Sequence, residues 1–452
     1  MLFHSSEFFL FFLVFLCGFA LFRAHARVVY VTIASFIFYG WWNPVYLPIL
    51  LGLSLYAYII ALRPKLSLAA FSFVIAGALT PLFIFKYAGF AATNMAWLFG
   101  TPKIASGGWA LPLGISFITF TVISYLVDVR KGTAAAETGF WRFFLYLSFF
   151  PHLIAGPIMR AKELLPQLKH LTFKPKLVKL GVLLFAVGMV KKMVVADPLS
   201  HWVDVYYSGA GARDLPHAML AFYAFPVQIY CDFSGYVDMA LGIAFILGIR
   251  LPLNFNRPYL ACSIREFWRR WHITLSRWLK DYLYIPMGGS AHGFTRTALA
   301  LLVTMLLGGL WHGASWTFVM WGGLHALFMI LEHAAGRFLK FRFPDFLKRL
   351  WTFHLVAILW IFFRAPTWRS LDGLFGGFFI PGSWTFLYSD AVFASLLILV
   401  TLALHFRDKV SFIVWIARRL PTVSVYAVSL ALILLCKIIA VGNPSAFIYF
   451  DF

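Results

Sequence analysis

Apolar runs recur along the whole sequence, and this recurrence restricts the fold more than any other feature. A helix of about 20 apolar residues crosses the hydrocarbon core of a bilayer and satisfies its own backbone hydrogen bonds there. The sequence therefore predicts an all-α, polytopic integral membrane bundle. The runs lie at residues 7–22, 28–42, 46–62, 67–85, 109–128, 141–158, 178–196, 217–249, 297–311, 313–332, 350–363, 391–406 and 423–441.

The composition supports a membrane protein made of one domain. Only 12% of the 452 residues are charged, whereas soluble proteins average about 25%. The 51 phenylalanines and 17 tryptophans suit contact with lipid and with its interfaces. We expect a single membrane domain over residues 1–452. The first run lacks a basic start and a small-residue cleavage site, so we expect a retained helix rather than a signal peptide.

Several runs are too short to span a bilayer, and many contain glycine or proline. Irregular backbone is tolerated at membrane depth only where it is buried in protein or lines a cavity. We therefore expect re-entrant segments and half-helices around a polar interior. Residues 141–158 have cations on both flanks, so this run is expected to enter and leave from the same face.

The net charge of +21 is concentrated in short stretches between the apolar runs. This distribution follows the positive-inside rule, and it suits anionic phospholipid headgroups or an acidic partner rather than nucleic acid. The connections at 196–217 and 365–389 hold few cations and are assigned to the outer side, as is the N-terminus. Lys191 and Lys192 fit this scheme badly. The stretches assigned to the cytoplasm are 23–27, 63–65, 130–131, 160–179, 257–280, 337–349 and 407–419.

The stretch IREFWRRWHITLSRWLKDYLY, residues 264–284, combines cations with tryptophans at helical spacing. This pattern predicts an amphipathic helix at the membrane interface. One interpretation is a surface anchor. The other is a basic rim, including Arg269, that attracts the phosphates of an anionic acyl donor.

His312 lies within GGLWHGASW, between two apolar runs. An ionisable side chain at membrane depth is costly and usually faces a bundle interior or a cavity. Gly308, Gly309 and Gly313 would allow helices to approach closely beside it. His312 is therefore either a structural histidine bonded between helices or a proton acceptor, a role that its near-neutral pKa suits.

The remaining histidines and the cysteines do not indicate a metal site. His325 follows His312 by 13 residues, which places the two on different sides of any shared helix. His272 belongs to the amphipathic stretch, where a histidine is ordinarily solvated. The cysteines, Cys17, Cys231, Cys262 and Cys436, are far apart and form no CxxC pair, so neither a disulfide framework nor a zinc site is expected.

The stretch QIYCDFSGYVD places two carboxylates, Asp232 and Asp238, in an apolar region. They belong either to a structural polar network or to the lining of a polar passage. Ser234 lacks the GxSxG context of a nucleophile elbow. Asn254 and Asn256 precede Pro258 and have the character of turn residues.

Motifs in one order along most of the chain resemble the membrane-bound O-acyltransferase family, and within it the bacterial alginate O-acetyltransferase-like branch. The first hundred residues and most of the chain after Ala365 are the least diagnostic. The matching stretches are PLGISFITFTVISYLVDV, FFPHLIAGPIMR, VKKMVVAD, QIYCDFSGYVDMALG, LPLNFNRPYL, EFWRRWHITLSRWLKDYLYIPMGG, GGLWHGASW, WIFFRA and FIYF.

The resemblance implies that His312 is catalytic within a central tunnel and that His272 is a second functional position. It implies a bacterial inner-membrane enzyme that takes an acetyl group from a cytoplasmic thioester, either acetyl-coenzyme A or an acyl carrier, with no tightly bound cofactor and no metal. Periplasmic acetyltransferase-like subunits and a polysaccharide synthase are the implied partners, and alginate or cellulose is the implied class of polymer. The substrate-binding candidates are Asp232, Ser234, Asp238, Asn256, Arg269 and Trp311.

Two alternatives remain open. A related enzyme would transfer another acyl group, such as D-alanine, to a cell-wall polymer. A saccharide transporter would be favoured by broken helices at corresponding positions of two repeats, and the sequence shows no such repeat.

Overall fold

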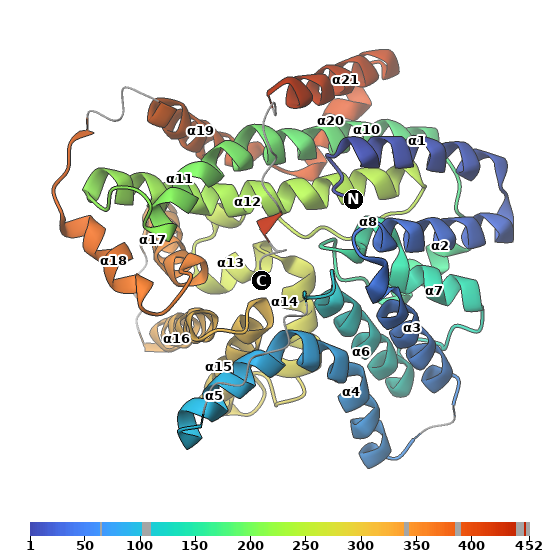
Figure 1. Ribbon diagram of the computed structural model, residues 1–452, viewed down its shortest axis with the longest axis horizontal. Coiled ribbons are helices and arrows are strands. Elements are labelled where there is room, and N and C mark those ends of the chain that lie inside the picture. Colours follow the sequence, from blue (N-terminus) through green and yellow to red (C-terminus); the bar gives the residue numbers. More distant parts are fainter. Residues whose placement is uncertain (64–65, 102–109, 339–342, 385–389, 440–446, 449–452) are drawn as a thin grey trace. The chain divides into compact units, whose positions relative to one another are not determined.

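The computed structural model describes residues 1–63, 66–101, 110–338, 343–384, 390–439 and 447–448. These residues form helices joined by turns and loops, and no strand occurs among them (Figure 1). The prediction of an all-α fold is confirmed. The helices are α1 Ser6–Leu21, α2 Ala24–Gly40, α3 Leu47–Ala61, α4 Leu68–Leu82, α5 Ala88–Phe99, α6 Ile115–Lys131, α7 Phe140–Ser148, α8 Phe150–Leu153, α9 Ala161–Leu168, α10 Pro175–Met189, α11 Asp197–Ser208, α12 Leu215–Ile246, α13 Ile264–Arg270, α14 Ile273–Leu279, α15 Gly293–His312, α16 Trp316–Phe338, α17 Asp345–Arg364, α18 Ser370–Gly376, α19 Asp390–Leu404, α20 Val410–Arg419 and α21 Thr422–Ile439.

Within the described residues, seven helical segments are long and apolar enough to cross a membrane. An eighth candidate is bent by 75° between α19 and α20, as expected for a broken span or a re-entrant segment. The run at 141–158 is also interrupted, because α7 ends at Ser148 and α8 starts at Phe150 with Pro151 in its first turn. These features confirm a polytopic membrane fold. The seven segments are Pro44–Ala61, Leu68–Phe99, Leu215–Ile246, Gly293–His312, Trp316–Gly336, Asp345–Arg364 and Thr422–Ile439.

Helix α12 differs from the other candidate spans in its burial. All of its apolar window is buried inside the protein, whereas α4 and α5 together bury only 11% of theirs. Its interior position explains why α12 carries Asp232 and Asp238 within an apolar run, since buried polar groups find partners within the protein.

The amphipathic stretch at 264–284 is not one helix. It divides into α13 and α14 at Trp271 and His272, and His272 has a positive φ of 43°. The tryptophans face protein rather than lipid, because Trp268, Trp271 and Trp278 are all buried. His272 is fully buried, so the prediction of a solvated histidine is wrong.

The chain divides into two compact units. Unit 1 comprises residues 1–185 and 239–252, and unit 2 comprises residues 186–238 and 253–452. In unit 1, α2 packs on α7, and both α3 and α4 pack on α6. Phe150 of α8 lies in an aromatic cluster there, with ring centroids 5.3 Å from both Phe15 and Phe38.

Unit 2 contains the basic helices and the GGLWHGASW hairpin. In unit 2, α15 packs on α16, and α16 also packs on α13 and α17. A single turn of π-helix, Val190–Ala196, follows α10 and carries Lys191 and Lys192. Such π-helical turns occur frequently at functional sites.

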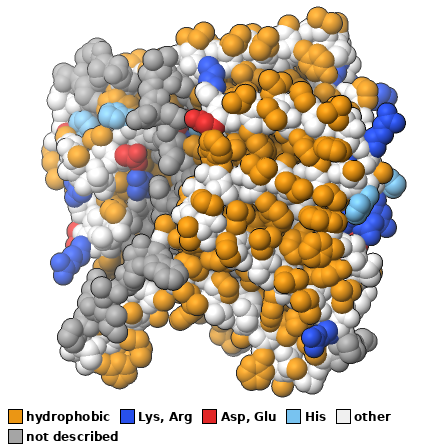
Figure 2. Space-filling view, turned by 45° about the vertical axis from the view of Figure 1, so that its right-hand side comes forward, with side chains coloured by type: hydrophobic (Ala, Val, Ile, Leu, Met, Phe, Trp, Pro, Cys, Tyr) orange, Lys and Arg blue, Asp and Glu red, His pale blue; other side chains and the backbone are white. Residues whose placement is uncertain are grey.

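Hydrophobic side chains dominate the surface drawn in Figure 2, and lysine and arginine side chains lie mainly at its margins. Exposed apolar residues such as Phe73, Trp97 and Val423 suit contact with lipid. Parts of the predicted segments 63–65, 109–128, 337–349, 365–389 and 423–441 lie outside the described residues, as do Tyr449 and Phe450 of the FIYF motif.

Candidate active site

His312 is held at the end of α15 by close packing of α15 on α16. A Cβ added at Gly309 would lie 2.2 Å from the carbonyl oxygen of Phe318, and one added at Gly322 would lie 2.2 Å from that of Met305. The two helices therefore touch backbone to backbone, which only glycine permits. The sequence prediction of close helix approach beside His312 is confirmed for Gly309.

Aromatic rings surround His312, which is only 2% exposed. Its ring centroid lies 4.9 Å from that of Trp311, 5.1 Å from that of Trp321 and 5.4 Å from that of Phe363, and all three rings meet it edge to face or nearly so. Trp311, a substrate-binding candidate, is thus a direct neighbour of His312. The packing fixes the imidazole in a largely apolar environment, in which a proton transfer is screened from bulk water.

His272 also contacts Trp311, with ring centroids 6.1 Å apart. The two predicted catalytic histidines are therefore brought to the same aromatic cluster. Phe233 of α12 also packs edge-on against His272, at 4.8 Å. Burial lowers the pKa of His272 to about 3, so its ring is neutral at pH 7.

The position of His272 is set by Asn254, which the sequence analysis treated as a turn residue. The side-chain oxygen of Asn254 accepts from the backbone amide of Thr274 at 3.1 Å and from its hydroxyl at 2.8 Å. The same oxygen lies 3.2 Å from Nδ1 of His272. The backbone amide of Ile273 donates to the carbonyl of Asn254 at 2.9 Å. These bonds stabilise the positive φ of His272 and direct its ring inward.

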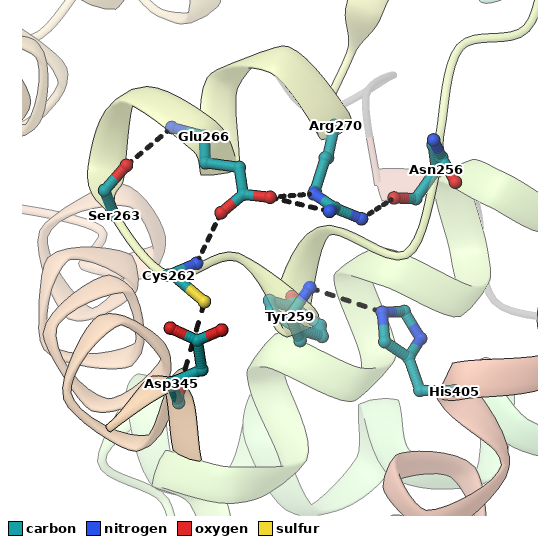
Figure 3. Close-up of polar contacts among 8 residues, drawn as sticks. All are labelled: Asn256, Tyr259, Cys262, Ser263, Glu266, Arg270, Asp345 and His405. Atoms are coloured by element: carbon teal, nitrogen blue, oxygen red, sulfur yellow. Dashed lines mark hydrogen bonds and ion pairs between the residues drawn. The ribbon is translucent and has the colours of Figure 1, made fainter. Parts of the chain in front are cut away.

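Asn256, the predicted substrate-binding asparagine, is exposed instead, and its backbone pairs with Arg270. Its amide donates to the Arg270 carbonyl at 2.9 Å, and its carbonyl accepts from the guanidinium at 3.3 Å. Figure 3 shows that the same guanidinium also binds Glu266. The role proposed for the Asn256 side chain stays a prediction.

The start of α13 is fixed by a further set of bonds (Figure 3). Ser263 caps the helix by accepting from the amide of Glu266 at 3.0 Å, and Glu266 accepts from the amide of Cys262 at 2.7 Å. Burial opposes ionisation of Glu266, but the Cys262 amide and Arg270 outweigh it and lower the pKa of the carboxyl. The amide of Tyr259 donates to Nε2 of His405 at 3.3 Å. The segment that carries Asn254 is thus bonded to α13 through Asn256 and Arg270, and to the turn His405–Arg407 through Tyr259.

His325 belongs to the same cluster, which the sequence analysis did not predict. Its ring centroid lies 4.8 Å from that of Trp321, and the indole N–H of Trp268 donates to its Nδ1 at 3.3 Å. His325 is fully buried. Trp311 and Trp321 thus connect three histidines, with His312 between His272 and His325.

Asp232 and Asp238 are paired with the two lysines that fitted the charge pattern badly. Nζ of Lys192 lies 2.6 Å from Asp232 and 2.8 Å from Asp197. The second carboxylate oxygen of Asp232 accepts from the amide of Ile448 at 2.8 Å. These contacts match the structural alternative for Asp232, and they explain how Lys192 can be 2% exposed.

Lys191 also forms ion pairs with two aspartates, Asp238 and Asp408. Its Nζ lies 2.8 Å from Asp238 and 2.7 Å from Asp408, which lies between α19 and α20. Asp408 also accepts from the hydroxyl of Tyr230 at 2.5 Å. On α12, Ser234 lies between Asp232 and Asp238 in the sequence. It is 2% exposed, and its hydroxyl has no hydrogen-bond partner among the described residues.

A pocket of about 320 Å³ opens beside this cluster, and cations line it. Arg265, Arg269 and Lys280 contribute positive charge, while Ser276 and Thr304 contribute hydroxyl groups. Arg269 therefore lines a cationic pocket, and the basic-rim interpretation stays a prediction. Trp268 lines the same pocket and contacts both His325 and Trp321, with centroids at 5.2 and 5.6 Å. It separates the pocket from the histidine cluster.

Comparison with known proteins agrees with the motifs. The chain is 39% identical over 395 residues to the probable alginate O-acetylase AlgI of Pseudomonas aeruginosa, covering 85% of this chain and 76% of that protein. It is 36% identical over 406 residues to the peptidoglycan O-acetyltransferase of Helicobacter pylori, covering 79% and 76%. The teichoic acid D-alanyltransferase of Bacillus subtilis is 26% identical over 273 residues, covering 56% and 69%.

The family-level match extends over residues 66–367 and includes every predicted catalytic and substrate-binding residue. Since this match covers more than half of the chain, and the identity to relatives extends beyond it, the family assignment does not depend on one motif. The chain belongs to the MBOAT, membrane-bound O-acyltransferase, family and is an O-acyltransferase.

Proposed function

We propose that this protein transfers an acetyl group from a cytoplasmic thioester across the bacterial inner membrane, for O-acetylation of an exopolysaccharide of the alginate or cellulose class. The names of two relatives, an alginate O-acetylase and a peptidoglycan O-acetyltransferase, support acetyl transfer to a polysaccharide. The observation that carries the proposal is the placement of His312 with His272 around Trp311.

The proposed reaction forms one ester bond and breaks one thioester bond. His312 takes the proton of the acceptor hydroxyl as that oxygen attacks the thioester carbonyl carbon. The carbon–sulfur bond then breaks, and the thiolate recovers the proton from the imidazolium. A variant of this scheme has His312 itself accept the acetyl group before passing it on. Because His312 is buried, the neighbouring aromatic side chains must move to admit the acyl group.

The basic pocket suits the phosphates of the thioester donor. Arg265, Arg269 and Lys280 would bind the phosphates of coenzyme A or of a phosphopantetheine arm, which stay outside the apolar cluster. The acetyl group carries no charge, so moving it past Trp268 costs far less than moving the phosphates. We propose that periplasmic acetyltransferase-like subunits and a polysaccharide synthase act with this protein, and that its two units work as one membrane domain.

The test is to replace His312 by alanine and to supply acetyl-coenzyme A to the full-length protein in proteoliposomes. We expect thiol release, and acetate on the polymer in cells, to fall by about 100-fold or more. His201→Ala is the matched control, because His201 is exposed on α11, away from the aromatic cluster. A His312→Ala protein that inserts normally and retains wild-type acetylation would exclude the proposal.

The relationship to a teichoic acid D-alanyltransferase supports a second candidate, transfer of D-alanine. A D-alanyl carrier thioester and acetyl-coenzyme A, offered to the same proteoliposomes, separate the two. Preferential consumption of the D-alanyl donor would favour the second candidate.

A further inference from the structure

Two buried histidines, His272 and His325, flank His312 through shared tryptophans. Trp311 contacts His272 and His312, with ring centroids at 6.1 and 4.9 Å. Trp321 contacts His312 and His325, at 5.1 and 4.8 Å. A neutral imidazole has one N–H and one lone pair, so the chemistry that each ring offers depends on which nitrogen holds the proton.

The tautomer of His325 follows from the partner of its Nδ1. That partner is the indole Nε1–H of Trp268, at 3.3 Å, and an indole nitrogen only donates. Nδ1 of His325 must therefore hold the lone pair, and the ring proton of the neutral form lies on Nε2. Nε2 is buried and has no hydrogen-bond partner among the described residues. A buried donor in this state calls for an explanation, and a bound substrate atom that accepts from it would supply one.

His272 has the opposite tautomer, for an equally direct reason. The amide of Asn254 could face either way, but the backbone N–H of Thr274 donates to it at 3.1 Å, so the contacting atom is oxygen. The Thr274 hydroxyl, at 2.8 Å, meets the same atom. Nδ1 of His272, at 3.2 Å from this oxygen, must then carry the proton. The lone pair of His272 lies on Nε2.

Acyl transfer needs both a nitrogen that carries a proton and a nitrogen that carries a lone pair. Negative charge develops on the carbonyl oxygen as the thioester is attacked, and a buried N–H directed at that oxygen stabilises it strongly. A nitrogen lone pair instead accepts a proton or orients a hydroxyl group. Since His272 reaches His312 through Trp311 and His325 reaches it through Trp321, different residues supply the two kinds of nitrogen.

We infer that His325 is a further residue of the active site, in which its Nε2–H donates to the acyl oxygen of the substrate. Trp268 is then a positioning residue that fixes the His325 tautomer, and Asn254 is a positioning residue that fixes the opposite tautomer of His272. The assignment of tautomers stands on the contacts alone, whereas the role of His325 in catalysis rests on the proposed function.

The tautomers can be tested without any substrate. Full-length protein labelled with ¹⁵N-histidine, in proteoliposomes, is measured by magic-angle-spinning NMR, and the His325 signals are assigned by their loss in His325→Gln. We expect a protonated Nε2 and an unprotonated Nδ1. In Trp268→Phe, which keeps an aromatic ring but removes the donor, we expect the Nδ1 signal to shift and both tautomers to appear.

Trp360→Phe is the matched control for that substitution. Trp360 is buried and stacks on Trp321 with centroids 5.6 Å apart, but its indole N–H has no acceptor within the described part of the chain. We expect the His325 signals to be unchanged in this variant. A wild-type spectrum with the His325 proton on Nδ1, or with both nitrogens protonated, overturns the inference.

The catalytic role is tested by two substitutions of His325 with acetyl-coenzyme A as the donor. His325→Phe keeps an aromatic ring and loses the donor, so we expect kcat to fall by about 100-fold or more with little change in KM. His325→Gln keeps an N–H and should recover at least 10-fold of that loss. Equal activities for the two variants, or wild-type activity in His325→Phe, refute the role of His325.

The outcomes also separate this inference from the proposed function. If His312→Ala remains active, the proposed function fails, but the tautomer measurement still stands by itself. If His312→Ala is inactive and His325→Phe is fully active, only the inference fails. Should His325→Phe not insert, acyl transfer by Trp268→Phe and Trp360→Phe decides the catalytic role: we expect kcat to fall further in Trp268→Phe, and equal values would refute the role of His325.

Discussion

At the scale of single residues, the buried charges are the feature that sequence reasoning explained least. The positive-inside rule left Lys191 and Lys192 without an explanation, because the rule concerns loops rather than the protein interior. The structure explains both lysines by pairs of aspartates. That Asp232 and Asp238 would need partners follows from the apolar run around them. The sequence does not show which lysine pairs with each aspartate, because Lys192 and Asp232 are 40 positions apart and only the fold brings them together.

We predict that Lys192→Met destabilises the protein by about 3–5 kcal/mol, because it leaves the buried Asp232 and the partly buried Asp197 without their cation. Thermal unfolding of the detergent-solubilised protein, followed by loss of helical circular dichroism, measures the effect. Lys176→Met is the control on α10, where the lysine is exposed, and should change stability by no more than about 0.5 kcal/mol. Similar midpoints for the two variants would contradict the structural role of Lys192.

The asparagines show a second limit of sequence reasoning at this scale. Nothing in the spacing of LPLNFNRPYL distinguishes Asn254 from Asn256, and both precede the same proline. Asn254 is 1% exposed and contacts His272, whereas Asn256 is exposed. The difference arises from Thr274 and Arg270, which approach the two residues from α14 and α13.

At the scale of elements, the long runs and the interrupted run at 141–158 were predictable, but the break within residues 264–284 was not. The runs at 217–249 and 297–311 correspond closely to α12 and α15, because apolar length alone indicates a helix of this kind. The break between α13 and α14 escaped prediction because the helical spacing of tryptophans continues across it. The positive φ of His272 depends on bonds from Asn254, a residue of another segment.

The contact of α15 with α16 gives a prediction at this scale. Gly309→Ala should destabilise the protein by about 1–3 kcal/mol and reduce acyl transfer, since its Cβ would meet the backbone of α16 at Phe318. In the neighbouring Gly308→Ala, the nearest atom would be the end of the Leu279 side chain at 3.3 Å, which can move. Melting temperatures and thiol release from acetyl-coenzyme A, measured for both variants, check this. Equal losses at the two positions would show that backbone contact is not what holds His312.

At the scale of the whole molecule, the fold class could be predicted because lipid permits few backbone arrangements. The orientation of the chain in the membrane was predicted only from the distribution of lysine and arginine. Residues 160–179 are expected on the cytoplasmic side and residues 196–217 on the outer side. The site itself required the resemblance to a family, because His272, His312 and His325 carry no shared local spacing. Their association comes from Trp311 and Trp321.

Sidedness can be checked by cysteine labelling in a variant without the four native cysteines. Lys176→Cys and Ser208→Cys both lie at exposed positions, on opposite sides of the predicted membrane. In intact cells with a permeable outer membrane, a membrane-impermeant maleimide should label Ser208→Cys, and should label Lys176→Cys only after the inner membrane is disrupted. The reverse pattern would invert the assigned topology and place the basic pocket on the outer side.

The burial of α12 has a consequence for how the protein is made. A helix with two aspartates enters a bilayer unfavourably on its own. Synthesis proceeds from the N-terminus, so Lys191 and Lys192 are made before Asp232 and Asp238, with which they pair in the folded protein. The order of these residues along the chain thus lets each carboxylate meet its counterion during insertion, before α12 has to face lipid alone.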